Sequence, residues 1–122
     1  MAYALLIVET PGEREVRSEA QARERYDRMV RFGHDLKDRG LLTLSQSLTS
    51  DRSGARVRVQ GGVTSVVDGP FSEAKEMIGG FFLLTCGSRD QAIAIARECP
   101  AVGWATVEVR EVGPCIGALS KP

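Results

Sequence analysis

The sequence predicts one α+β domain over residues 1–122, with the ferredoxin-like element order βαββαβ and an inserted β-hairpin. Two segments have helical hydrophobic periodicity together with capping signals. Short segments rich in Val, Ile and Leu surround them, and a Gly-Gly pair separates two of these segments as a hairpin turn does. A chain of 122 residues can bury one hydrophobic core, which favours a single domain.

The first strand and the first helix follow each other along the chain. Residues 3–9 are apolar at positions that point to both faces of a strand, so we expect both faces to be covered. A helix is predicted over residues 19–39, because Ser18 and Gln21 form a capping box and Gly40 suits the residue just past a helix end. The predicted core-facing side of this helix consists of Ala22, Tyr26, Met29, Phe32, Gly33 and Leu36.

The central part of the chain predicts three strands. Residues 41–48 form the first of them. Residues 55–67 then alternate apolar and polar side chains on both sides of Gly61 and Gly62, which tolerate the positive φ angles of a two-residue hairpin turn.

The last part predicts a strand, a helix and a strand. Residues 80–86 are apolar on both faces, and Gly79-Gly80 marks either the restart of a strand or a bulge. The helix begins after Ser88, which forms a capping box with Gln91, and it stops at Pro100. Residues 104–111 alternate apolar and polar side chains and complete the predicted sheet.

Two helices can cover only one face of this sheet. The strands over residues 3–9 and 80–86 are apolar on both faces, which leaves a second apolar face without a cover. The same face of a second copy is the simplest cover, so we expect a homodimer.

Composition limits the remaining possibilities. Sixteen basic and sixteen acidic residues balance, which gives no electrostatic reason to expect a nucleic acid or an anionic membrane as partner. No apolar run reaches the roughly 18 residues of a membrane helix, and no signal-peptide pattern is present, so we expect a cytoplasmic protein. The three cysteines lack metal-site spacing and no Gly-rich phosphate loop exists, so we expect no metal and no cofactor.

The segment DGPFSEAKE, residues 68–76, interrupts two apolar strands with charge, and two interpretations stay open. In the first, Asp68 or Glu76 acts as a general acid or base in a cleft between sheet and helices. Lys75, Glu73 and Arg58 would then hold a small anionic metabolite. In the second, the segment makes a turn that the Asp68 carboxylate caps by accepting backbone N–H groups, and it pairs its other charges. The protein would then be a non-catalytic dimeric module that binds a metabolite or a protein.

The stretch VVDGPFSEAKEMIGGFFLL, residues 66–84, resembles the hallmark of the DGPF-motif family, also called the YCII-related family. The matching positions are Asp68, Gly69, Pro70, Phe71, Glu73, Lys75, Glu76, Gly79, Gly80 and Phe81. The resemblance extends over nearly the whole chain and implies a dimeric ferredoxin-like α/β barrel. Members of the family are often encoded beside extracytoplasmic-function sigma factors, which implies an accessory regulatory role.

More distant YCII-like proteins resemble small lyases or dehydrochlorinases that use a His and Asp pair. The single histidine here, His34, lies about 140° from Met29 on the predicted first helix, on its polar side. A His–Asp mechanism therefore does not transfer to this chain.

Overall fold

A computed structural model describes residues 1–115 as a four-stranded antiparallel sheet, three helices and a separate β-hairpin. The elements in chain order are β1 (Ala2–Glu9), α1 (Glu13–Val16), α2 (Glu19–Asp38), β2 (Leu42–Ser47), β3 (Ala55–Gln60), β4 (Val63–Asp68), β5 (Met77–Thr85), α3 (Arg89–Glu98) and β6 (Thr106–Glu111). Short 3-10 turns occupy Asp51–Ser53 and Pro100–Gly103.

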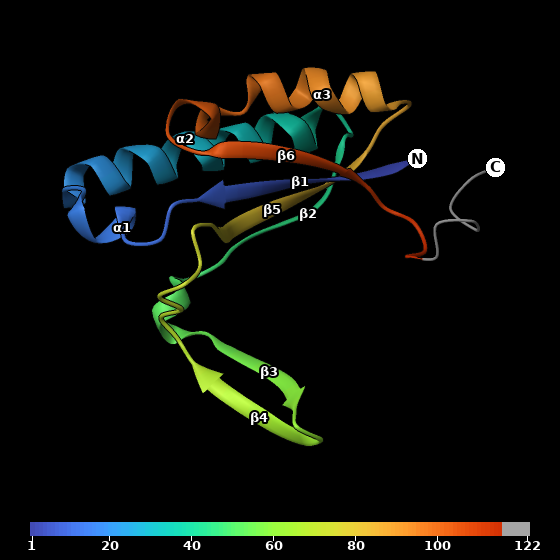
Figure 1. Ribbon diagram of the computed structural model, residues 1–122. Coiled ribbons are helices and arrows are strands. Elements are labelled where there is room, and N and C mark those ends of the chain that lie inside the picture. The colour runs from blue at the N-terminus through green and yellow to red at the C-terminus, as the bar shows by residue number, and fades with distance from the viewer. Residues whose placement is uncertain (116–122) are drawn as a thin grey trace.

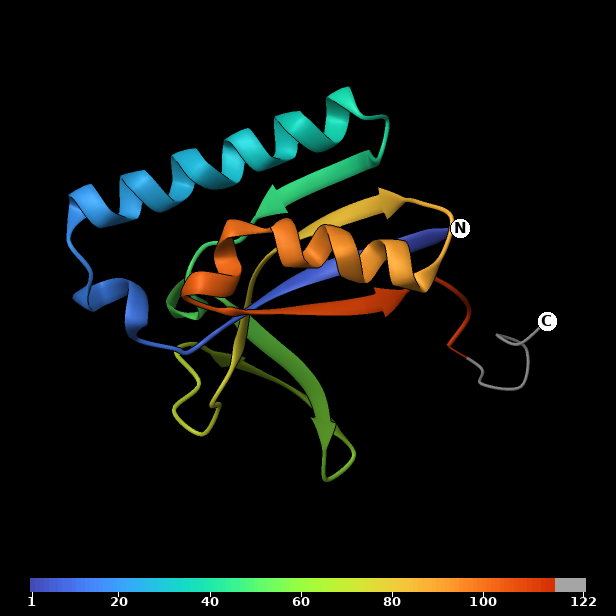
Figure 2. The same ribbon diagram turned by 90° about the horizontal axis from the view of Figure 1, so that it is seen from above.

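The four-stranded sheet has the order β2-β5-β1-β6, and each neighbouring pair is antiparallel. Helices α2 and α3 cover one face of it, and the β3–β4 hairpin projects from the opposite side (Figure 1). Viewed from above, α2 runs along the β2 side and α3 lies over the other half of the sheet (Figure 2). The predicted α+β class is therefore confirmed.

The core lies between the helices and the sheet. Its completely buried large side chains are Leu5, Leu36, Leu84, Ile95 and Cys99. The rings of Phe32 and Phe82 meet edge to face, with centroids 5.2 Å apart, and join α2 to β5. In the described part of the chain, no helix is long and apolar enough to span a membrane.

The predicted helix and turn signals are confirmed. The hydroxyls of Ser18 and Ser88 each accept a hydrogen bond of 3.1 Å from the backbone N–H three residues on, which is the expected N-cap geometry. Gly40 follows α2 with φ of 73°, and Gly61 and Gly62 have φ of 58° and 80° at the hairpin turn.

Helix α2 departs from its predicted packing. Phe32, Gly33 and Leu36 are buried as expected, but Tyr26 is 60% exposed and Ala22 is only half-buried. The amphipathic pattern identified the correct face, yet the sheet covers only the part of that face nearest the end of the helix. The short helix α1 before it was not predicted, because four residues are too few to show a period.

Strand β5 begins three residues earlier than predicted, at Met77. Ile7 pairs with Gly80 and Val8 pairs with Ile78, so Gly79 is an extra residue in the β1–β5 ladder. That arrangement is a β-bulge, one of the two roles that Gly-Gly has within a strand.

Candidate functional site

The DGPF turn follows β4 and makes backbone contacts with the segment that precedes β3. The N–H of Gly69 donates to the carbonyl oxygen of Gly54 at 2.8 Å, and the peptide bond from Gly69 to Pro70 is cis. A Cβ atom at position 69 would overlap the carbonyl oxygen of Asp51. Glycine is therefore required here, because two backbone segments approach closer than a side chain allows.

Phe71 and Glu73 are held by an arginine from the hairpin. The guanidinium carbon of Arg56 lies 4.0 Å from the centroid of the Phe71 ring, and its Nη1 is 3.1 Å from Oε1 of Glu73. The N–H of Phe71 makes a long contact of 3.5 Å with Oδ2 of Asp51. Phe71 is thus half-buried at the base of the hairpin, where it anchors the arm.

Asp68 does not cap this turn. We expected its carboxylate to accept backbone N–H groups, but among residues 1–115 it makes no hydrogen bond, and the nearest carboxylate contact to the turn comes from Asp51. The sequence has a local turn signal at Ser50-Asp51, and in the structure Ser50 Oγ accepts the N–H of Arg52 at 3.3 Å. The proximity of Asp51 to Phe71, twenty residues away, could not be predicted from the local pattern.

The five predicted site residues, Asp68, Glu73, Lys75, Glu76 and Arg58, are all exposed. Within the described residues, Glu73 forms an ion pair with Arg56, and no ion pair joins Lys75 to Glu73 or Glu76. Glu76 lines a hollow of about 450 Å³ between the hairpin base and the sheet, together with Asp51 and Glu108. The other four lie outside the lining of that hollow.

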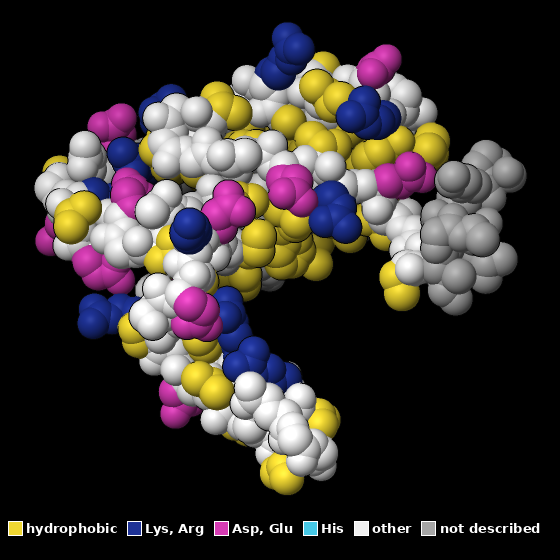
Figure 3. Space-filling view, in the orientation of Figure 1, with side chains coloured by type: hydrophobic (Ala, Val, Ile, Leu, Met, Phe, Trp, Pro, Cys, Tyr) yellow, Lys and Arg dark blue, Asp and Glu magenta, His cyan; other side chains and the backbone are white. Residues whose placement is uncertain are grey.

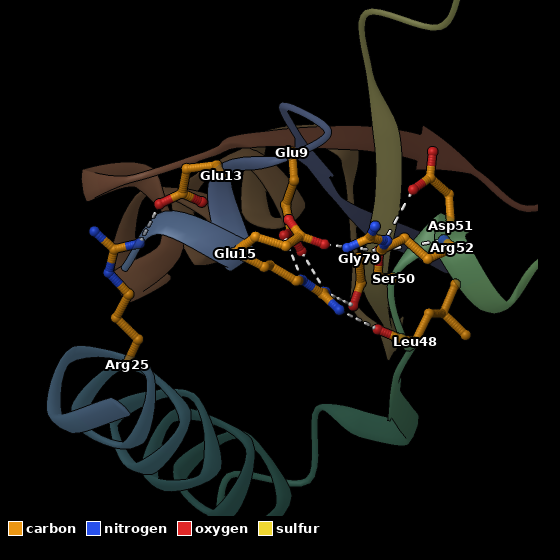
Figure 4. Close-up of polar contacts among 10 residues, drawn as sticks. Glu9, Glu13, Glu15, Arg25, Leu48, Ser50, Asp51, Arg52 and Gly79 are labelled. Carbon is orange, nitrogen blue, oxygen red and sulfur yellow. Dashed lines mark hydrogen bonds and ion pairs between the residues drawn. The ribbon is translucent and has the colours of Figure 1, made fainter. Parts of the chain in front are cut away.

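Gly79, the first residue of the Gly79-Gly80 pair, lies against a largely buried ion pair that the sequence did not reveal. Arg14 from α1 makes a two-pronged contact with Glu9, with Nε to Oε1 at 2.8 Å and Nη2 to Oε2 at 2.7 Å (Figure 4). Only 8% of the Glu9 side chain is exposed. Hydrogen bonding to Glu9 raises the pKa of Arg14 above its ordinary value.

The same arginine ties three segments together. Its Nη1 donates to the carbonyl oxygen of Leu48 at 2.8 Å, and its Nη2 donates to that of Gly79 at 3.2 Å (Figure 4). A Cβ at position 79 would overlap the Glu9 carboxylate. Gly79 therefore makes room for the clamp between β1, α1 and the loop after β2.

A larger cleft of about 620 Å³ lies between α2 and the sheet, where a cleft was expected. Glu9, Arg14, Gly79 and Gly80 line it, and none of the five predicted charged residues does. His34 is exposed, as predicted, and it also forms part of the cleft wall.

Within residues 1–115, the cysteine side chains lie outside the two hollows. Cys86 and Cys99 are buried and Cys115 is exposed, and all three are free thiols. Burial raises the pKa of the Cys99 thiol. Over residues 1–115, no group of three His, Cys, Asp or Glu side chains could hold a metal ion.

These features define a small α/β domain whose family hallmark sits at the junction of a sheet and a projecting hairpin. The chain belongs to the YCII-related domain family, whose model matches residues 1–116. This confirms the family predicted from the DGPF motif.

A curated relative from Rhizobium meliloti (strain 1021), described as an uncharacterized protein, is 39% identical over 79 residues. The match covers 62% of this chain and 58% of the relative, so this chain matches less than two thirds of the relative's length.

Proposed function

We propose that the protein is a cytoplasmic, non-catalytic homodimeric accessory module in which the DGPF motif is architectural. The proposal rests on which residues of the motif make contacts and which are exposed. Gly69, Phe71 and Gly79 meet structural partners, whereas the charges of Asp68, Lys75 and Glu76 are exposed and do not converge. Three free thiols suit a reducing compartment.

The homodimer is supported by apolar surface that a single chain leaves open. Hydrophobic side chains gather on the underside of the sheet, in the hollow that it forms with the hairpin (Figure 3). By strand alternation, the apolar side chains on this face that are not fully buried include Ala4, Leu6, Leu44, Phe81 and Leu83. Polar side chains of the edge strands, those of Gln46, Glu108 and Arg110, lie on the same face beside them. Apolar patches of this kind mark interaction surfaces.

The hairpin adds a second uncovered apolar face. Val57 pairs with Val66 and lies on the same face of the hairpin as Val59, and these side chains are 65–67% exposed. A two-fold arrangement brings the underside and hairpin of each copy against those of the other. The sheet order β2-β5-β1-β6, with both helices on one face, supports the ferredoxin-like plan, and two such sheets face to face support the dimeric α/β barrel.

The dimer is tested by placing a charge on the underside. We expect the wild type to have twice the mass of one chain in light scattering at micromolar concentration, and Leu83→Asp to be monomeric. Val102→Asp is the matched control, because Val102 is 55% exposed in the turn before β6 and outside that face, so it should stay dimeric. A monomeric wild type would refute the homodimer.

The architectural role of the motif is tested at Lys75. Replacing Lys75 with Met should change the free energy of unfolding by less than about 0.5 kcal/mol, because the side chain is exposed and has no ion pair within residues 1–115. Phe71→Ala should lower it by about 2 kcal/mol, because it removes half-buried aromatic surface and the Arg56 contact. Urea denaturation measures both, and a loss of several kcal/mol in Lys75→Met would contradict the proposal.

The second candidate function is an acid/base enzyme with Asp68 or Glu76 as the reactive carboxylate and Lys75, Glu73 and Arg58 as binding residues. The hollow of about 450 Å³ beside Glu76 favours it. Mass spectrometry of metabolites that copurify with the wild type, Glu76→Gln and Lys75→Met distinguishes the two. An anion retained by the wild type and lost from both variants, at unchanged stability, would favour the enzyme.

A further inference from the structure

Near its start, helix α2 leaves part of its apolar side over a cleft, although Met29 also contacts the sulfur of Cys99. At Gly33 the helix comes close to the sheet, since a Cβ there would lie 3.6 Å from Cε2 of Phe82. Toward the start of the helix, Tyr26 and Met29 line the cleft of about 620 Å³ that extends from β2 to α1. That volume lies within the usual range of about 300–1,000 Å³ for small-molecule sites.

The cleft has both an apolar wall and polar groups. Tyr26, Met29 and Phe82 offer apolar and aromatic surface, and Ser45 and Ser47, which share one face of β2, offer hydroxyl groups. A site of this composition holds an apolar body on its wall and orients it with a few polar contacts.

The charge of the cleft is positive and partly uncompensated. Arg14, Arg17, Arg25 and Lys37 line it together with a single carboxylate, that of Glu9. Glu9 neutralises Arg14, and Arg25 pairs with Glu13 at 2.7 Å while its guanidinium lies 5.0 Å from the centroid of Trp104.

Arg17, at the α1 end of the cleft, takes part in neither of these two ion pairs. It is half-buried and makes no ion pair with any residue that the structure describes. The hollow beside the motif has the opposite character, because Asp51, Glu76 and Glu108 line it with one arginine, Arg56. A small anion is thus favoured in the cleft under α2 and disfavoured beside the motif.

We propose that the cleft between α2 and the sheet binds a small organic anion, with its acid group at Arg17 and an apolar body against Tyr26 and Met29. This site is separate from the charged segment of residues 68–76, while Gly79 and Gly80 of the motif form part of its wall. The proposal does not depend on the motif being architectural. The ligand class is an aromatic or aliphatic carboxylate or sulfonate, because a guanidinium pairs with a planar acid group and the wall is apolar.

The test uses 8-anilinonaphthalene-1-sulfonate, which joins an aromatic body to a sulfonate. Trp104 is the single tryptophan and lines the cleft, so dye bound there should quench its fluorescence by energy transfer. We expect Arg17→Gln to bind about tenfold more weakly, Arg17→Lys to keep most of the affinity, and Tyr26→Ser to bind more weakly than wild type. Arg23→Gln is the matched control, since Arg23 is exposed and does not line the cleft.

Further controls separate this cleft from other apolar surfaces. Val57→Ser on the hairpin and Lys75→Met in the motif should bind the dye as the wild type does, and octanoate should displace it better than uncharged 1-octanol. Circular dichroism checks that each variant is folded. Unchanged affinity in Arg17→Gln, an equal loss in Arg23→Gln, or equal displacement by octanol would overturn the proposal.

Discussion

Replacing Gly79 with alanine is expected to lower the free energy of unfolding by about 3 kcal/mol, the scale of breaking a buried ion pair. The new methyl group would overlap the Glu9 carboxylate, which Arg14 holds with two hydrogen bonds. Glu9 cannot move aside without separating from the arginine, and only 8% of its side chain is exposed. Urea or thermal denaturation of the single variant measures the loss.

A double-mutant cycle tests whether the loss of stability in Gly79→Ala comes from the Glu9–Arg14 ion pair. In a Glu9→Ala background the carboxylate is gone, so adding Gly79→Ala should then change stability by less than about 1 kcal/mol. Gly103→Ala is the matched control, because a Cβ at Gly103 meets no atom within 4 Å and its φ is not positive. Additive losses in the double variant would show that Gly79 is required for another reason.

Local signals in the sequence predicted the elements well. The caps at Ser18 and Ser88 and the turn at Gly61 and Gly62 depend on residues within four positions of one another, and the structure has all of them. Strand β5 was predicted short at its start because Gly79 and Gly80 looked like a restart, whereas the strand passes through them as a bulge. A Gly-Gly pair is compatible with either a strand break or a bulge, and the pairing of β5 with β1 decides between them.

What the sequence could not predict depends on contacts between distant residues. Helical periodicity shows which side of α2 is apolar, but it does not show that the sheet stops short of Tyr26. The clamp at Gly79 joins Glu9 and Arg14 to a position 65 residues beyond the arginine, so no local pattern marks it.

The candidate site shows the same limit. Five charges that cluster around one motif were expected to cluster in space, but the partner of Glu73 is Arg56 from β3, seventeen residues earlier. An extended turn directs neighbouring side chains apart, and a surface pair of this kind contributes little energy. A high density of charged residues along a chain is therefore weak evidence for a binding site. An apolar helix face that no other element covers is stronger evidence.

Replacing Gly69 with alanine is expected to lower the free energy of unfolding by about 3 kcal/mol and to loosen the hairpin. The added Cβ would overlap the carbonyl oxygen of Asp51, which is backbone and cannot rotate away as a side chain can. Relief requires a shift of the turn at Asp51–Ser53, which would weaken the hydrogen bond of 2.8 Å from Gly69 to Gly54.

Hydrogen exchange separates this local effect from a general loss of stability. Amides of β3 and β4 should exchange faster in Gly69→Ala than in a core variant of equal free energy of unfolding. The core variant is Ile95→Val, measured in enough urea to lower its free energy of unfolding to that of Gly69→Ala. Amides of β1 should exchange equally in both, because the four-stranded sheet does not include the hairpin. Equal exchange of the hairpin amides would mean that Gly69 does not anchor the arm, and the architectural role proposed for the DGPF motif would then fail at its central residue.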